Sequence, residues 1–146
     1  MNDDELVYRR IFRAPRALVW RCLTEPADLA QFWGPRGMTT PVAGIVVELR
    51  PGGRFETLMN GEHGSHRMDA TFTDVVPPER LVWLEAATGM HTTSTLEDLG
   101  DGRTAVVISQ RNVPEAMRRP EARAGFLTSL DKLEEHLAHL TTGDQS

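Results

Sequence analysis

The chain has 146 residues, of which 40% are hydrophobic and 25% are charged, and its formal net charge is −5 at pH 7. This length suits one ordinary domain, and the composition excludes a disordered chain and one with spanning helices, since no apolar run approaches the ~20 residues that such a helix needs. The acidic charge argues against binding to nucleic acid, and the acidic start is unlike a secretory signal, so we expect a cytoplasmic protein with neither nucleic acid nor membrane as a partner.

The first part of the chain predicts one strand and two short helices. Residues 5–13 are rich in β-branched and aromatic side chains and predict the strand. Pro15 opens the first helix, in which the single cysteine, Cys22, is expected to be a small buried hydrophobe. Thr24 is expected to cap the second helix. The side chains that this second helix turns inward are Leu29, Phe32 and Trp33.

The middle of the chain predicts short strands separated by turn residues. They cover residues 45–49, 54–59, 67–76, 81–87, 91–99 and 103–111. Consecutive hairpins of this kind form an antiparallel meander. In residues 81–87 the odd-numbered and the even-numbered positions both carry apolar side chains, so whether Trp83 or Leu84 faces inward stays open. Residues 91–99 are expected to have one face exposed to solvent.

The clearest periodicity belongs to a final helix that begins at Pro120 and runs for about 21 residues, or ~31 Å. Its apolar stripe consists of Ala122, Phe126, Leu130, Leu133, Leu137 and Leu140. Gly125 interrupts this helix, where glycine costs ~1 kcal/mol relative to alanine. Either a strand approaches closely at this point or space is left for a ligand. The polar residues 141–146 are expected to fray.

Together these elements indicate one α+β domain over residues 1–146, in which a curved antiparallel sheet of six to seven strands wraps around the C-terminal helix, with two short helices after the first strand. This arrangement is a helix-grip fold. A twisted sheet leaves a gap beneath the helix, which is a natural place for a small apolar molecule. Each large side chain there could equally fill a dry core, but as a group they predict ligand contacts. The predicted ligand-binding residues are Phe32, Trp33, Phe55, Thr57, Met59, Met68, Phe72, Trp83, Phe126, Ser129 and Leu130.

Neither catalytic residues nor a metal site or cofactor is expected. His63, His66 and Asp69 recur at intervals of three, which alternates faces in a strand and does not bring the side chains to one ion. Glu85 and Glu97 could act as an acid or base if they faced a cavity, although strand carboxylates are more commonly solvated.

Several stretches together resemble the branch of the START/SRPBCC superfamily that is similar to activators of the heat-shock-protein-90 ATPase. They are APRALVW at 14–20, FWGP at 32–35, RPGGRF at 50–55, VVPPERLV at 75–82, and Gly125-Phe126 with Leu130 and Leu133. The resemblance runs over about residues 7–140 and implies a helix-grip fold with a hydrophobic pocket. It implies no particular reaction, because the superfamily includes lipid carriers, receptors, cyclases and self-resistance proteins. The chain departs from its relatives at Ala70, where they often carry glycine, and at Thr57, where they often carry an aromatic residue.

The leading hypothesis is therefore a protein that binds a small apolar molecule without catalysing a reaction. One alternative is a cyclase- or hydrolase-like enzyme that uses the same cavity, and another is a co-chaperone or similar interaction module. The eukaryotic activators that this chain resembles carry an additional N-terminal domain that engages the chaperone, and we expect no such domain here, so a chaperone partner is not favoured. A homodimer formed through an exposed sheet face or edge stays open.

Overall fold

The computed structural model describes residues 4–143, and its strands form a seven-stranded antiparallel sheet. The strands are β1 (Leu6–Phe12), β2 (Val46–Val47), β3 (Arg54–Gly61), β4 (Gly64–Val76), β5 (Arg80–Glu85), β6 (Met90–Asp98) and β7 (Thr104–Arg111). Their order in the sheet is β1-β7-β6-β5-β4-β3-β2. From β2 to β7 the strands follow one another as a meander, and β1 is added at the far edge beside β7. The predicted antiparallel meander is thus confirmed.

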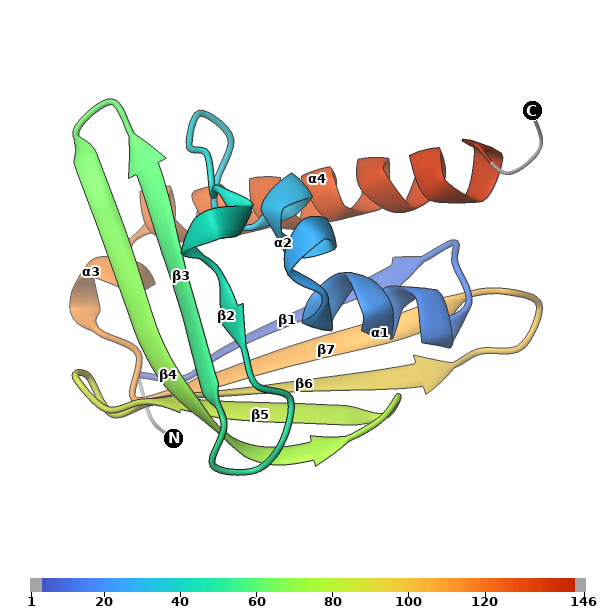
Figure 1. Ribbon diagram of the computed structural model, residues 1–146, viewed down its shortest axis with the longest axis horizontal. Helices are drawn as coiled ribbons and strands as arrows, with labels where there is room; N and C mark the ends of the chain where they lie inside the picture. Colours follow the sequence, from blue (N-terminus) through green and yellow to red (C-terminus); the bar gives the residue numbers. More distant parts are fainter. Residues whose placement is uncertain (1–3, 144–146) are drawn as a thin grey trace.

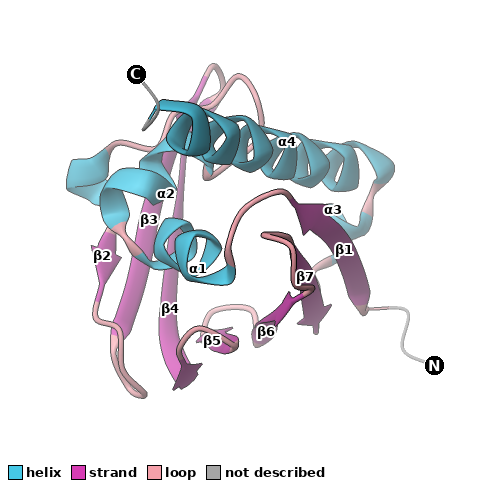
Figure 2. Ribbon diagram, turned by 90° about the vertical axis from the view of Figure 1, so that its right-hand side faces the viewer, coloured by secondary structure: helices cyan, strands magenta, loops and turns pink. Residues whose placement is uncertain are grey.

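The helices lie on one side of this sheet. They are α1 (Arg16–Thr24), α2 (Pro26–Phe32), the 3-10 turn η1 (Val42–Gly44), α3 (Glu115–Arg118) and α4 (Pro120–Gly143). The sheet bends around the helices, with α4 crossing above it and with α1 and α2 between α4 and the strands (Figures 1 and 2). The predicted α+β helix-grip fold is confirmed. We call the face of the sheet that is turned toward α4 the concave face.

The apolar stripe of α4 attaches this helix to the rest of the protein. Leu130, Leu133 and Leu137 are buried, while Phe126 and Leu140 are half-buried near the two ends of the stripe. Burying a leucine side chain contributes about 1.5–3 kcal/mol to folding. The three central leucines therefore fix α4 over the sheet more firmly than its ends.

Alternation decides which side chains the strands turn inward. On β5, Leu81 and Trp83 are buried, which settles the phase that the sequence left open. On β6, Thr92, Ser94 and Leu96 are buried, whereas Thr95 and Glu97 are exposed. The expectation that this strand has one exposed face is confirmed.

The predicted helix cap at Thr24 is wrong. Thr24 is the last residue of α1, where its hydroxyl donates a 2.8 Å hydrogen bond to the carbonyl of Trp20. Glu25 occupies the N-cap position of α2 and makes no side-chain capping bond. Because the Thr24 hydroxyl already bonds to the preceding turn, it is not available to the next helix.

The predicted strand over residues 45–49 is also too long, since only Val46 and Val47 pair with β3. The chain turns back so tightly after them that a β-carbon on Gly53 would lie 1.9 Å from the carbonyl oxygen of Glu48. The Glu48 amide donates to the carbonyl of Arg54 at 2.8 Å, which closes the turn. This close approach ends the strand early and requires glycine at position 53.

Two further differences concern helices. The sequence did not predict α3, a single turn between β7 and α4. Residues 141–143, which the sequence assigned to a frayed tail, belong to α4, where the hydroxyls of Thr141 and Thr142 both donate to the carbonyl of Ala138. Residues 144–146 of that predicted tail lie outside the described residues. Among residues 4–143, none of the helices combines the length and hydropathy that a membrane crossing requires.

Candidate functional site

Five of the predicted ligand-binding residues form one aromatic cluster on the concave face, beneath the end of α2. The ring of Phe55 lies at its centre, stacked on Phe72 at a centroid distance of 5.2 Å. Trp33 and Trp83 meet Phe55 edge-on at 5.3 and 5.0 Å. Phe32 adds an edge contact to Trp33 at 6.4 Å. We call these five residues the aromatic cluster; four of its rings are buried and Trp33 is half-buried.

Two of the predicted residues on α4 have structural partners instead. The Phe126 ring lies 4.3 Å from the ring of Tyr8 on β1, away from the aromatic cluster. The Ser129 hydroxyl is buried and donates a 2.7 Å hydrogen bond to the carbonyl of Phe32. Ser129 therefore joins α4 to the end of α2, directly behind the aromatic cluster.

The remaining predicted residues border the aromatic cluster. Met68 pairs with Thr57 across β3 and β4, and both side chains are buried. Leu130 is a buried residue of α4, and Met59 on β3 is half-buried beside Gly34. The strands and α2 thus bring most of these residues together, and their contact with a ligand stays a prediction.

The protein's own rings occupy this region of the concave face. Two hollows on the described surface lie elsewhere, and neither is bordered by a predicted ligand-binding residue. One, of about 270 Å³, is bordered by Gln31, Arg36, Lys132, Glu135, His136 and His139. The other, of about 480 Å³, is bordered by Ile11, Phe12, Arg13, Glu134, Leu137, Ala138 and Thr141. Because the rings of the aromatic cluster are in contact with one another and four of them are buried, a ligand there would need the rings to move.

Two buried hydroxyl groups on the concave face have no hydrogen-bond partner among residues 4–143. They belong to Thr57 on β3 and Thr92 on β6, which are 1% and 2% exposed. Thr57 lies two residues from Phe55 on the same face of β3, and Thr92 pairs with Trp83 across β5 and β6. A buried hydroxyl without a partner costs about 1–3 kcal/mol, so two of them beside one cluster of rings call for a physical explanation.

Thr92 was not among the predicted residues. Its strand alternates clearly, and its position opposite Trp83 places it beside the aromatic cluster. The sequence could identify it only once the phase of β5 was known. Predicting Thr92 as a site residue therefore required knowing whether Trp83 or Leu84 faces inward.

A carboxyl group also lies at the margin of the concave face. Glu85 is half-buried, and its neighbours across β4 and β6 are the buried Ala70 and Met90. Burial raises the pKa of Glu85 above its ordinary value, and the charge of His66 opposes this only in part. The protonated form of Glu85 is therefore favoured more than in a solvated strand carboxyl.

Gly125 does not leave space for a ligand. A β-carbon at this position would lie 3.3 Å from the Cβ of Pro35, in the loop that follows α2. The structure thus supports the close-approach explanation, but the neighbour is a loop and not a strand. The absent side chain lets this loop pack against α4 beside the end of the aromatic cluster.

Comparisons with known proteins agree with this geometry. Residues 13–138 match the model of the family described as activator of Hsp90 ATPase homolog 1-like protein. A crystal structure of a protein from Nitrosomonas europaea is similar, with a TM-score of 0.81 and 27% identity, covering 97% of this chain and 99% of that one. The AHSA1 protein from Silicibacter pomeroyi has a TM-score of 0.75 at 21% identity, covering 92% of this chain and 97% of that one. Among curated proteins, no sequence matches the chain.

Proposed function

Since the chain belongs to the family of activator of Hsp90 ATPase homolog 1-like proteins, we propose that it binds a small, mainly apolar molecule that carries a hydrogen-bonding group. The binding site is the aromatic cluster together with Thr57 and Thr92. The observation that carries the proposal is the pair of buried hydroxyls without partners. In a finished core such groups are normally bonded, whereas in a binding site they are satisfied by the ligand.

The chemical class of the ligand follows from the side chains around it. Flat rings in stacked and edge-on contact present faces and edges on which another flat or apolar molecule can pack. Each threonine hydroxyl can donate one hydrogen bond and accept others. The proposed ligand is therefore an apolar molecule, most favourably one with an aromatic ring, that carries a hydroxyl or carbonyl group.

Entry of the ligand is proposed to move Trp33. This ring is half-buried, whereas the other rings of the aromatic cluster are buried. Trp33 is also the C-cap of α2, and the next residue, Gly34, has a φ of +92° and begins the loop toward η1. A side chain at the end of a helix can turn outward without disturbing the sheet.

The experiment compares two probes of the same shape, naphthalene and 2-naphthol, which differ by one hydroxyl group. Binding is measured by the change in tryptophan fluorescence and by the shift in melting temperature of the full chain. We expect both probes to bind saturably, with 2-naphthol tighter. In the variants Thr57→Val and Thr92→Val, the preference for 2-naphthol should fall, because one hydrogen bond to the probe is lost.

Two controls define the outcome. Thr104→Val removes a buried hydroxyl that donates to the carbonyl of Ala14 at 2.8 Å, away from the aromatic cluster, and should leave the preference between the probes unchanged. Trp33→Phe should reduce the fluorescence change. Absence of saturable binding of either probe, or an unchanged preference in both threonine variants, would contradict the proposal.

A further inference from the structure

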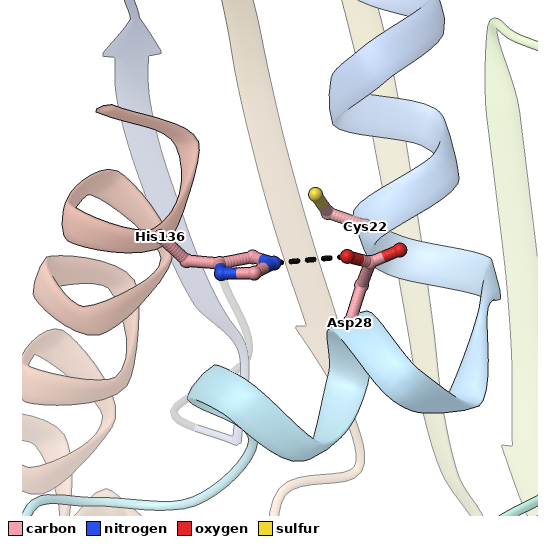
Figure 3. A group of neighbouring side chains, drawn as sticks. All are labelled: Cys22, Asp28 and His136. Carbon is pink, nitrogen blue, oxygen red and sulfur yellow. Dashed lines mark hydrogen bonds and ion pairs between the residues drawn. The ribbon is translucent and has the colours of Figure 1, made fainter. Parts of the chain in front are cut away.

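Three side chains that commonly bind metals meet where α1, α2 and α4 pack together. They are Cys22 on α1, Asp28 on α2 and His136 on α4 (Figure 3). The cysteine sulfur, a carboxylate oxygen and an imidazole nitrogen all lie within 4.8 Å of one another. Since 108 residues separate Asp28 from His136, only the fold brings these groups together.

The group is shielded from solvent. Cys22 is completely buried, and the side chains of Asp28 and His136 are each only 14% exposed. The Nε2 atom of His136 lies 2.9 Å from Oδ1 of Asp28, with the sulfur of Cys22 beside them. This contact holds the imidazole and the carboxylate together at the place where an ion could bind to both.

The three donor types match the preferences of zinc. Zn²⁺ takes thiolate sulfur, imidazole nitrogen and carboxylate oxygen in tetrahedral sites, and bond lengths of about 2.0–2.3 Å put neighbouring donors ~3.5 Å apart. To reach that spacing, the His136 and Asp28 donors, now 2.9 Å apart, would separate by roughly 0.6 Å, and the Cys22 sulfur, within 4.8 Å of them, would approach by up to roughly 1.3 Å. All three side chains have rotatable bonds between the backbone and the donor atom, so rotation of the side chains can supply this movement.

A fourth side chain holds the carboxylate in place. The Nε atom of Arg21 donates to Oδ2 of Asp28 at 3.2 Å, and its Nη2 atom makes a longer hydrogen bond of 3.5 Å to Oδ1, the oxygen that also lies 2.9 Å from His136. Arg21 can keep the shorter hydrogen bond to Oδ2 while Oδ1 exchanges its Arg21 contact for an ion. An outer partner that orients a carboxylate ligand is a regular feature of metal sites in proteins.

The group also has a route to solvent. His136 borders the hollow of about 270 Å³, which is lined by charged and polar side chains, including His139 one turn further along α4. An ion and its water could therefore reach His136 from this side. The hollow lies apart from the aromatic cluster, since the two share no residue.

The burial of the thiol argues against nucleophilic catalysis. Cys22 is completely buried, so a substrate cannot reach its sulfur despite the histidine nearby. A cation at this position would displace the thiol proton and bind the resulting thiolate.

We propose that Cys22, Asp28 and His136 form a site for one zinc ion, which joins α1, α2 and α4. No pattern in the sequence predicted this site. The histidines considered there, His63 and His66, are exposed on the hairpin of β3 and β4 with Asp69. The proposal does not depend on ligand binding at the aromatic cluster.

The test uses the full chain after removal of metals with a chelator, titrated with Co²⁺ as a spectroscopic substitute and then with Zn²⁺. We expect one equivalent of Co²⁺ to bind and to produce the near-ultraviolet absorption of charge transfer from a thiolate to cobalt. Zn²⁺ should remove this absorption and raise the melting temperature. Absence of the absorption in the wild-type protein would overturn the proposal, whatever the variants do.

Variants then assign the ligands. Cys22→Ala should abolish the charge-transfer absorption, and His136→Gln and Asp28→Asn should weaken Zn²⁺ binding. Arg21→Gln should lower the affinity about 10- to 100-fold, as for other outer-shell partners. The matched control is His139→Gln, which removes an exposed histidine of the same hollow and should change nothing. Retention of wild-type affinity in a folded Cys22→Ala variant would show binding by surface histidines and overturn the proposal.

Discussion

The guanidinium of Arg10 on β1 and the carboxylate of Asp131 on α4 lie 2.7 Å apart and join the edge strand to the long helix. Arg10 shares its face of β1 with the buried Tyr8 and Phe12, so its charge is directed beneath α4. The side chain of Arg10 is 24% exposed and that of Asp131 is 48% exposed. The pair is therefore less screened by water than most surface ion pairs.

This pair predicts a measurable coupling between the two residues. Asp131→Ala leaves the Arg10 charge without its partner and should lower the free energy of unfolding by about 1 kcal/mol. In the double variant Arg10→Met/Asp131→Ala, part of the loss should be recovered, because the methionine covers apolar surface without a charge. Urea denaturation of the four proteins in the mutant cycle measures the coupling.

The control for this cycle is the pair Arg103 and Asp101 in the hairpin of β6 and β7, whose side chains are 46% and 63% exposed. Its coupling should be close to zero. Equal coupling energies for the two pairs would contradict the argument from burial.

Gly125 gives a second prediction. Gly125→Ala should gain helix propensity of ~1 kcal/mol but must accommodate a contact of 3.3 Å with the Cβ of Pro35, so its net effect on stability should be smaller than that gain. Gly125→Leu should destabilise the protein by about 1–3 kcal/mol, because the larger side chain forces the loop away from α4. Thermal denaturation of both variants checks this, and a stable Leu variant would contradict the close packing.

A third prediction compares buried threonines with and without partners. Thr57→Val replaces an unsatisfied hydroxyl with a methyl group of similar size and should raise the free energy of unfolding by about 1 kcal/mol. Thr104→Val breaks a buried 2.8 Å hydrogen bond and leaves the Ala14 carbonyl without that donor, so it should lower stability by about 1–2 kcal/mol. Denaturant unfolding without ligand measures both. Effects of the same sign would argue that Thr57 has a partner in solution.

The architecture could be predicted from the sequence because its signals are periodic and long. The six-member stripe of α4 and the turns between β3 and β7 define a helix over a meander. The wrong predictions, the cap at Thr24 and the length of the strand over residues 45–49, resulted from local contacts. The Thr24 hydroxyl bonds backward to Trp20, and Gly53 packs against the backbone at Glu48, and neither contact leaves a pattern in the sequence.

The residues of the two candidate sites differ in how well they could be predicted from the sequence. Phe55 and Thr57 could be placed because their strand alternates cleanly, whereas Thr92 depended on the phase of a neighbouring strand. The group of Cys22, Asp28 and His136 could not be predicted at all. No regular spacing in the sequence links its members. Asp28 and His136 meet only because α2 packs on α4 in the folded protein.

The last prediction concerns Glu85, whose pKa is raised by burial. For a carboxyl group with a folded-state pKa above its unfolded value, the folded protein binds more protons than the unfolded chain between the two values. The contribution of Glu85 to stability therefore falls as the pH rises from about 4.5, the ordinary value for glutamate, through the higher folded-state pKa. At lower pH the group is protonated in both states and makes no such difference.

Glu85→Gln should therefore be more stable than the wild type at pH 7, and the two proteins should become equally stable as the pH falls below about 4.5. Urea denaturation across this pH range measures the difference. The control is Glu97→Gln, which removes the same charge from the exposed face of β6 and so separates the effect of burial from that of net charge. If both variants follow the same pH dependence, the change in net charge is sufficient to explain it, and the carboxyl of Glu85 is as well solvated as that of Glu97.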